Sequence, residues 1–105
     1  MVYSLTAPTL DMLILSIISR DDSYGYQISQ QIKTVSSMKD SALYPILKKL
    51  SDNGYVDVYD QQFQGRNRRY YRITDNGKLQ FHFLYENWRT YIDDIEQIVN
   101  IKEDS

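Results

Sequence analysis

The stretch SALYPILKKLSDNGYVDVYD, residues 41–60, decides the fold because its hydrophobic period changes part-way along. Its first part has the three-to-four-residue spacing of an amphipathic helix, and Pro45 is acceptable there because it lies in the early turns. Asp40 can cap the start of this helix, and Asn53 with Gly54 can close its end. Four apolar side chains share about 100° of helical arc, which predicts a face turned to the core: Leu43, Ile46, Leu47 and Leu50.

The residues that follow this helix predict a β-hairpin. YVDVYDQ, residues 55–61, alternates apolar and polar side chains, with Val56 and Val58 on one face. QFQG, residues 62–65, forms the connection, and NRRYYRI, residues 67–73, forms the second strand. A hairpin directly after a helix is the arrangement that places a wing beside a recognition helix.

Two further helices are expected before residue 40. SLTAPTLDMLILSIIS, residues 4–19, reads as the first, with Thr6 as its cap. The second starts after a turn in which Asp22 or Ser23 can act as cap. Gly25 in its first turn lowers helix stability, which indicates that another part of the chain approaches the backbone there. The second helix carries these side chains on one face: Tyr24, Ile28, Ile32 and Val35.

A long last helix is predicted from the cap Thr74 to about Ile101. Its apolar residues recur at a spacing of three and four, which is the seam of a coiled coil, and a second apolar series runs beside the first. The combined face is too broad for packing on one small domain, so we expect a homodimer, with packing inside one chain as the alternative. The predicted dimer interface consists of Phe81, Leu84, Tyr85, Trp88, Tyr91, Ile92, Ile95, Ile98 and Val99.

The predicted fold class is therefore mainly α with a small β-hairpin. A winged helix-turn-helix domain is expected over residues 1–74, followed by a C-terminal dimerisation helix over residues 75–105. The length of 105 residues fits one small domain with an appended helix.

The composition excludes several classes of function. There is no cysteine and one histidine, so neither a metal site nor a nucleophile–base pair is predicted, and we expect no cofactor and no enzyme activity. No secretory signal and no apolar run long enough to cross a bilayer is visible, which favours a cytoplasmic protein.

Basic residues are concentrated in the middle of the chain. Residues 33–72 hold eight Lys and Arg against four Asp, although the whole chain has a net charge of −2. Arg68, Tyr70 and Arg72 share one strand face and are expected to form an exposed stripe, whereas the sides taken by Arg66 and Arg69 stay open. Such a surface suits the phosphates of nucleic acid, with a solvated helix face as the alternative for the third helix. The candidate DNA-contacting residues are Lys39, Ser41, Tyr44, Pro45, Lys48, Lys49, Arg66, Arg68, Arg69, Tyr70 and Arg72.

Three linked motifs carry a family resemblance: SYGYQI, ALYPILKKLSDNGYV and GRNRRYYRITDNG. From about Leu10 to Gly77 the chain resembles the PadR family of bacterial transcriptional regulators, in its short form. The resemblance implies a homodimer that binds double-stranded operator DNA, usually as a repressor relieved by a small molecule. The resemblance adds Tyr26 to the expected DNA-contacting residues. It also implies structural roles for Tyr71 in the wing and for Thr74 at the cap of the helix that follows.

The resemblance also suggests an effector site. In some short members, aromatic side chains of the last helix line a cavity for planar hydrophobic compounds, which makes Trp88 the candidate ligand platform. A packed interface tryptophan is the alternative. The alternative for the whole chain is a winged-helix module that binds an acidic protein partner through its arginines.

Overall fold

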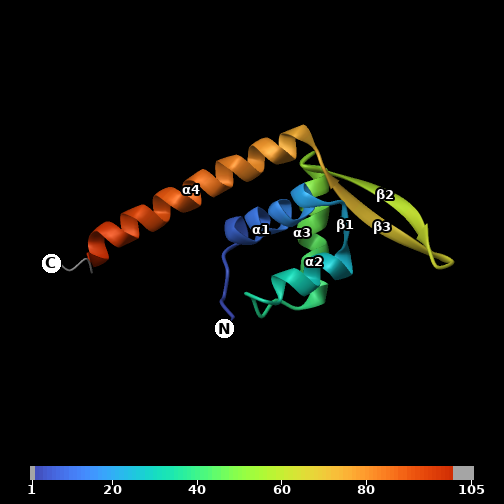
Figure 1. Cartoon of the computed structure of the whole chain (residues 1–105), viewed down its shortest axis with the longest axis horizontal. Helices are drawn as coiled ribbons and strands as arrows, with labels where there is room; N and C mark the ends of the chain where they lie inside the picture. The colour runs from blue at the N-terminus through green and yellow to red at the C-terminus, as the bar shows by residue number, and fades with distance from the viewer. Residues whose placement is uncertain (1, 101–105) are drawn as a thin grey trace.

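The computed structural model describes residues 2–100, and within them four helices and three strands follow one another (Figure 1). The wing and the last helix point away from the helical body in opposite directions (Figure 1). The predicted fold class is confirmed, with one strand more than the hairpin. The elements are α1 Ala7–Arg20, β1 Ser23–Tyr24, α2 Gly25–Ile32, α3 Asp40–Asp52, β2 Val56–Phe63, β3 Arg66–Ile73 and α4 Asp75–Val99.

The core lies between the first three helices and the base of the hairpin. Leu43, Leu47 and Leu50 of α3 are fully buried, as their spacing predicts, whereas Ile46 is only half-buried at the edge. From the hairpin, Val56 and Tyr71 complete the same cluster. The remaining buried members come from α1 and α2: Ile14, Leu15, Ile17, Ile18, Ile28 and Ile32.

The predicted N-cap residues of two helices are confirmed, and those of the two other helices are wrong. The Thr6 and Thr74 side chains accept hydrogen bonds from the first turns of α1 and α4, as predicted. In α2 the N-cap is Tyr24, because the preceding residues are extended as a strand and the helix begins only after it. In α3 the N-cap is Lys39, and Asp40 is the first helical residue, with its carboxylate bonded to α2 instead of the helix end.

The sheet has the order β1-β3-β2, with all neighbours antiparallel. The short strand β1, which pairs with Tyr70 and Tyr71 of β3, is missed by sequence reasoning because two residues carry no periodic signal. The hairpin turn is also tighter than the four-residue connection expected. Only Gln64 and Gly65 lie outside the strands, at φ values of 51° and 76°, which is the two-residue turn that matches the twist of a hairpin.

The first part of the last helix packs against α1, and its far half extends past the body. Phe81 and Leu84 pack against the core of the same chain, so these two predicted interface residues are already half-buried within the single chain. Farther along, the helix extends past the body (Figure 1), and the molecule reaches 62 Å in its longest dimension. The helix ends at Val99, with Asn100 in the left-handed conformation, and residues 101–105 of the predicted segment lie outside the described residues. In the described part of the chain, no helix combines the length and apolar character that a membrane span requires.

The base of the hairpin and the start of α4 are joined by a close contact at Gly77. A Cβ atom at Gly77 would lie 2.0 Å from the carbonyl oxygen of Tyr55 and 2.8 Å from Ile73 Cγ1. Thr74 connects the same parts, because its N–H donates to the Tyr55 carbonyl at 3.1 Å and its hydroxyl to the Gly54 carbonyl at 2.6 Å. Only glycine leaves room for this crossing.

We expect Gly77→Ala to lower the free energy of unfolding by about 3 kcal/mol or more, because backbone must move to admit the methyl group. Chemical denaturation at equilibrium measures this change. Gly54→Ala is the matched comparison, since Gly54 has a φ of +78° but open space around it. It should cost only about 1–2 kcal/mol, and equal losses for the two variants would contradict the role assigned to the Tyr55 contact.

Candidate nucleic-acid interface

The outer side of α3 presents a mixed polar and aromatic surface. Ser41, Tyr44 and Pro45 are all exposed there, as predicted, and Tyr44 is 52% exposed. Its ring lies over Gly25, whose added Cβ would be 2.9 Å from the ring and the hydroxyl. This contact confirms the close approach expected at Gly25. Tyr26, the next residue, is 61% exposed.

Two of the three lysines near α3 have acidic partners. Lys48 Nζ lies 3.0 Å from Asp52 one turn along the same helix, and both side chains are largely exposed. Lys49 Nζ lies 2.8 Å from Asp11 of α1 and therefore ties α3 to the body. Lys39 at the N-terminal end is exposed and has no ion pair among residues 2–100. Exposed ion pairs of this kind are weak, so Lys48 can still turn to another anion.

A polar clamp holds the start of α3 against α2. The buried hydroxyl of Ser29 donates to Asp40, and Lys33 Nζ lies 2.7 Å from the same carboxylate. Hydrogen bonds from Lys33 and Ser29 lower the pKa of Asp40, with burial acting weakly in the other direction. The clamp holds α3 against the end of α2. Sequence reasoning missed it because Ser29 and Asp40 are eleven residues apart and belong to different helices.

One face of the hairpin, here called the outer face, carries a stack of rings and guanidinium groups. Arg68 Cζ lies 4.0 Å from the ring centre of Tyr24 on one side and 4.0 Å from that of Phe63 on the other. Tyr70 stacks on Tyr59 with centroids 5.6 Å apart and meets Tyr24 edge-on at 5.5 Å. The predicted exposed stripe is therefore wrong for Arg68 and Tyr70, which are half-buried under rings of the same chain.

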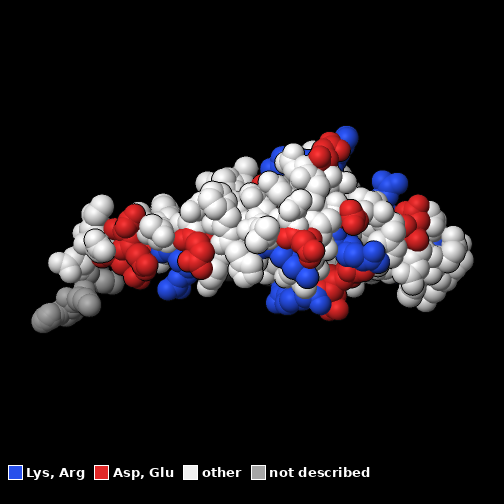
Figure 2. Space-filling view, turned by 90° about the horizontal axis from the view of Figure 1, so that it is seen from above, with Lys and Arg blue, Asp and Glu red and all other residues white. Residues whose placement is uncertain are grey.

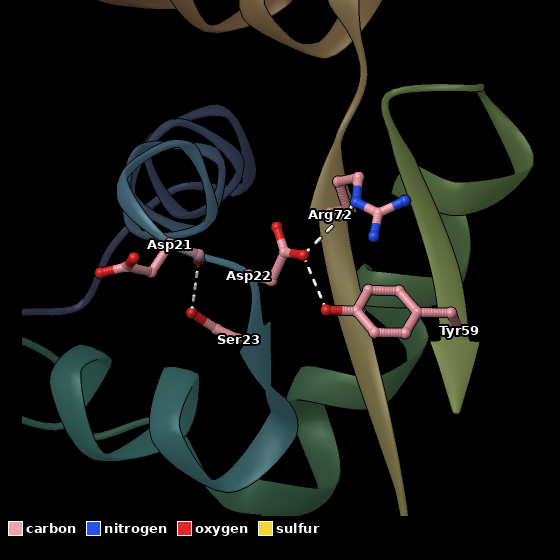
Figure 3. A network of polar contacts seen from close by, with 5 residues as sticks. All are labelled: Asp21, Asp22, Ser23, Tyr59 and Arg72. Atoms are coloured by element: carbon pink, nitrogen blue, oxygen red, sulfur yellow. Dashed lines mark hydrogen bonds and ion pairs between the residues drawn. The ribbon is translucent and has the colours of Figure 1, made fainter. Parts of the chain in front are cut away.

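The base of the outer face ends in a small polar network (Figure 3). The Tyr59 hydroxyl donates to Asp22 at 2.7 Å, and Arg72 Nε donates to the same carboxylate oxygen at 3.3 Å. Arg72 also lies over the Tyr59 ring, 4.6 Å from its centre. The hydrogen bond to Asp22 is the main reason that the pKa of Tyr59 is raised above its usual 10.0. Asp22 was expected only as a helix cap, so its contact with the wing is a further residue that sequence reasoning missed.

The opposite face of the hairpin, here called the inner face, turns toward the helices. Tyr71 is buried in the core, and this burial raises its pKa. Arg69 projects from this face and Arg66 from the outer one, which settles the two orientations that the sequence left open. The side chain of Arg69 is 66% exposed, and its only ion pair within residues 2–100 is a long one of 3.7 Å to Asp60.

Charge is unevenly distributed over the surface. Figure 2 shows acidic side chains gathered on the far half of α4, at the left, and mixed charges over the body. Asp93, Asp94 and Glu96 are the exposed acids of that half. No group of three His, Cys, Asp or Glu side chains in the described part of the chain is arranged to hold a metal ion.

The last helix leaves apolar side chains exposed and borders a hollow. Tyr91, Ile95, Ile98 and Val99 are exposed, Ile98 by 85%, whereas Ile92 is half-buried. A hollow of about 440 Å³ lies between the N-terminal segment, α1 and α4. Its lining residues are Ser4, Leu5, Thr6, Pro8, Thr9, Met12, Leu84, Asn87, Trp88 and Tyr91.

The family model named Transcriptional regulator PadR-like family matches residues 14–82, which include α2, α3 and the wing. The chain belongs to this family. The resemblance seen in the three sequence motifs is thereby confirmed, and so is the prediction that the chain is not an enzyme, because members of this family are transcriptional regulators.

Solved structures of similar chains agree with this assignment. The crystal structure of smu.1704 from Streptococcus mutans UA159 has a TM-score of 0.90 at 46% identity, covering 100% of this chain and 99% of that one. A PadR family transcription regulator from hypervirulent Clostridium difficile R20291 has a TM-score of 0.79 at 30% identity, covering 86% and 97%.

A third structure includes DNA. Bacillus subtilis PadR, solved in complex with operator DNA, has a TM-score of 0.64 at 32% identity, covering 70% of this chain but only 44% of that one. In sequence, the Bacillus protein is a negative transcriptional regulator that is 33% identical over 79 residues. The similarity therefore covers less than half of the Bacillus protein.

Proposed function

We propose that this chain is a cytoplasmic, homodimeric repressor that binds double-stranded operator DNA through α3 and the wing. The observation that carries the proposal is the exposure of Tyr26 and of the outer side of α3, together with the polar clamp at Asp40 that holds α3 against α2. The operator complex of the similar Bacillus subtilis PadR supports it. Ser41, Tyr44, Pro45 and Lys48 would meet base edges, since helices of this kind lie in the major groove. Lys39 and the wing would meet phosphates, whereas Lys49, also a candidate from the sequence, is paired with Asp11.

Duplex binding measured against salt tests this function. We expect the logarithm of the affinity to fall linearly with the logarithm of salt concentration, by about 0.9 for each phosphate neutralised. Selection of bound duplexes from a random pool should then return a site with two symmetric halves about one helical turn apart. Fluorescence anisotropy of labelled duplexes gives the affinities. Absence of binding at low salt would contradict the proposal and favour a module that binds an acidic protein partner.

The dimer is proposed to form through the far half of α4. Tyr85, Ile95 and Val99 are exposed on the seam side of the helix, and a lone helix with such a face gains stability from a partner. Two copies related by a two-fold axis would present two α3 helices to the two halves of an operator. Because Phe81 and Leu84 already pack inside one protomer, the interface is expected to lie mainly beyond Leu84.

We expect Ile95→Asp to weaken the dimer by about 3 kcal/mol, or roughly 100-fold in Kd, because a charge would be buried in the apolar seam. Sedimentation velocity over a range of concentrations measures the change. Thr90→Asp is the matched control, since Thr90 is exposed and lies about 140° away around the helix. Equal effects of the two substitutions, or a monomeric parent protein, would exclude this interface.

A small-molecule effector is proposed to bind beside Trp88. The indole is half-buried and borders the 440 Å³ hollow, whose lining offers both apolar side chains and the hydroxyls of Ser4, Thr6 and Thr9. Stacking on an indole suits planar hydrophobic compounds. Binding there would change how α4 lies against the body and hence the separation of the two DNA-binding heads.

The single tryptophan makes the effector site testable. We expect some members of a panel of planar aromatic compounds to quench Trp88 fluorescence and to change duplex affinity several-fold, in the range of about 1–3 kcal/mol typical of coupled sites. Isothermal titration to the Trp88→Leu variant provides the control, which should lose most of the binding. Compounds that neither quench nor alter duplex affinity would remove the effector from the proposal.

A further inference from the structure

The wing has two faces that could contact a partner, and the arginines on these faces differ in the contacts they make within the chain. Because neighbouring residues of a strand point to opposite faces, Arg68 and Arg69 lie back to back. Cross-strand pairing places Phe63, Tyr59 and Asp57 on the outer face with Arg68, and Asp60 on the inner face with Arg69.

Two arginines of the outer face, Arg68 and Arg72, are engaged within the chain, whereas Arg66 beside the hairpin turn is exposed. Arg68 Cζ lies 4.0 Å from the ring centres of both Tyr24 and Phe63, so these rings restrict the approach of a phosphate to the guanidinium. Arg72 is held by Asp22 and by the ring of Tyr59. Rings stacked on a guanidinium stabilise the arrangement through attraction between the cation and the π-face. These contacts also join β1 to the hairpin, because Tyr24 belongs to β1.

The inner face of the wing packs into the same hydrophobic core as α3. Tyr71 on this face belongs to the same buried cluster as Leu43 and Leu47 of α3. It also lies close enough to Tyr44 and Arg69 for both to influence its pKa. Tyr44 is part of the exposed surface of α3 that we assign to DNA. A duplex seated on α3 would therefore meet the inner face of the wing before the outer one.

Arg69 is well placed for such a contact. It lies two residues beyond Tyr71 on the same face, in the direction of the hairpin tip, and its side chain is largely exposed. The separation of 3.7 Å from Asp60 is too long for a good hydrogen bond, so the guanidinium can exchange this acid for a phosphate at little loss. Asp60 itself would oppose the approach of a polyanion.

We infer that the wing meets the DNA backbone with its inner face, through Arg69, and that Arg68 and Arg72 serve the wing structurally. Asp60 then weakens the affinity for DNA, because its negative charge lies close to Arg69 and repels the phosphates. This inference rests on the proposed DNA-binding function and assigns to its wing a particular face. It differs from the sequence-based prediction, in which Arg68, Tyr70 and Arg72 form the exposed stripe that contacts DNA.

Two pairs of variants with equal charge changes test the inference. Arg69→Gln and Arg68→Gln each remove one positive charge from neighbouring positions on opposite faces. Asp60→Asn and Asp57→Asn each remove one negative charge from β2, again on opposite faces. Asp57 is exposed and has no ion pair within residues 2–100, so its substitution is a matched control. The probe is a mixed-sequence duplex about three helical turns long, titrated at several salt concentrations.

We expect Arg69→Gln to reduce the salt slope by about 0.9 for each protomer that contacts the duplex, and Arg68→Gln to leave the slope unchanged. Arg68→Gln should instead lower the melting temperature more than Arg69→Gln does. Asp60→Asn should raise the affinity roughly twofold to fivefold, and Asp57→Asn should raise it less.

The acid variants keep the test decisive even where Arg68→Gln impairs folding, because both sit on the surface. A slope reduced by Arg68→Gln and not by Arg69→Gln would overturn the inference. So would a gain in affinity from Asp57→Asn that equals the gain from Asp60→Asn. If the parent protein binds no duplex at low salt, the proposed function itself fails, whereas binding with the wrong pattern of variants overturns only the choice of face.

Discussion

The contact between Gly77 and the carbonyl oxygen of Tyr55 is the constraint on which the rest of the structure depends. At this one point the start of β2, the end of β3 and the first turn of α4 meet with no room for a side chain. The Thr74 side chain reinforces the junction, since it accepts from Gly77 N–H and donates to Gly54. Packed backbone of this kind has few alternative arrangements, so the direction of α4 is coupled to the base of the wing. A change in how α4 lies would therefore be transmitted to the surface that is proposed to bind DNA.

A second constraint is the internal use of positive charge. Lys33, Lys49 and Arg72 each lie beside an aspartate on another element, and these pairs connect α2 with α3, α1 with α3, and the wing with the α1–β1 link. Arg68 is held by rings instead. Part of the basic middle of the chain is thus explained by architecture, and only the remainder is available to a polyanion. This division accounts for a concentrated arginine strip in a chain whose net charge is −2.

The sequence predicts well those features that depend on neighbours in the chain. The caps Thr6 and Thr74 and the burial of the three leucines of α3 follow from spacing within a few residues, and these are confirmed. The strand β1 could not be predicted, because two extended residues become a strand only through pairing with Tyr70 and Tyr71. For the same reason the cap of α2 was misplaced. Strand parity placed Arg68 on the correct face, but parity cannot reveal that Tyr24 from another strand covers it.

The two ends of the molecule carry opposite chemistry, and this separation follows from the direction set at Gly77. The far half of α4 exposes Ile95 and Ile98 together with the acids Asp93 and Asp94. Like charges repel phosphates, so this half is unfavourable for DNA and its apolar side chains remain free for a partner helix. The wing reaches out on the other side of the body (Figure 1) with Arg66 and Arg69 exposed. Because the helix and the wing begin at one junction, the proposed association through α4 and the proposed DNA contact of the wing need not compete for the same surface.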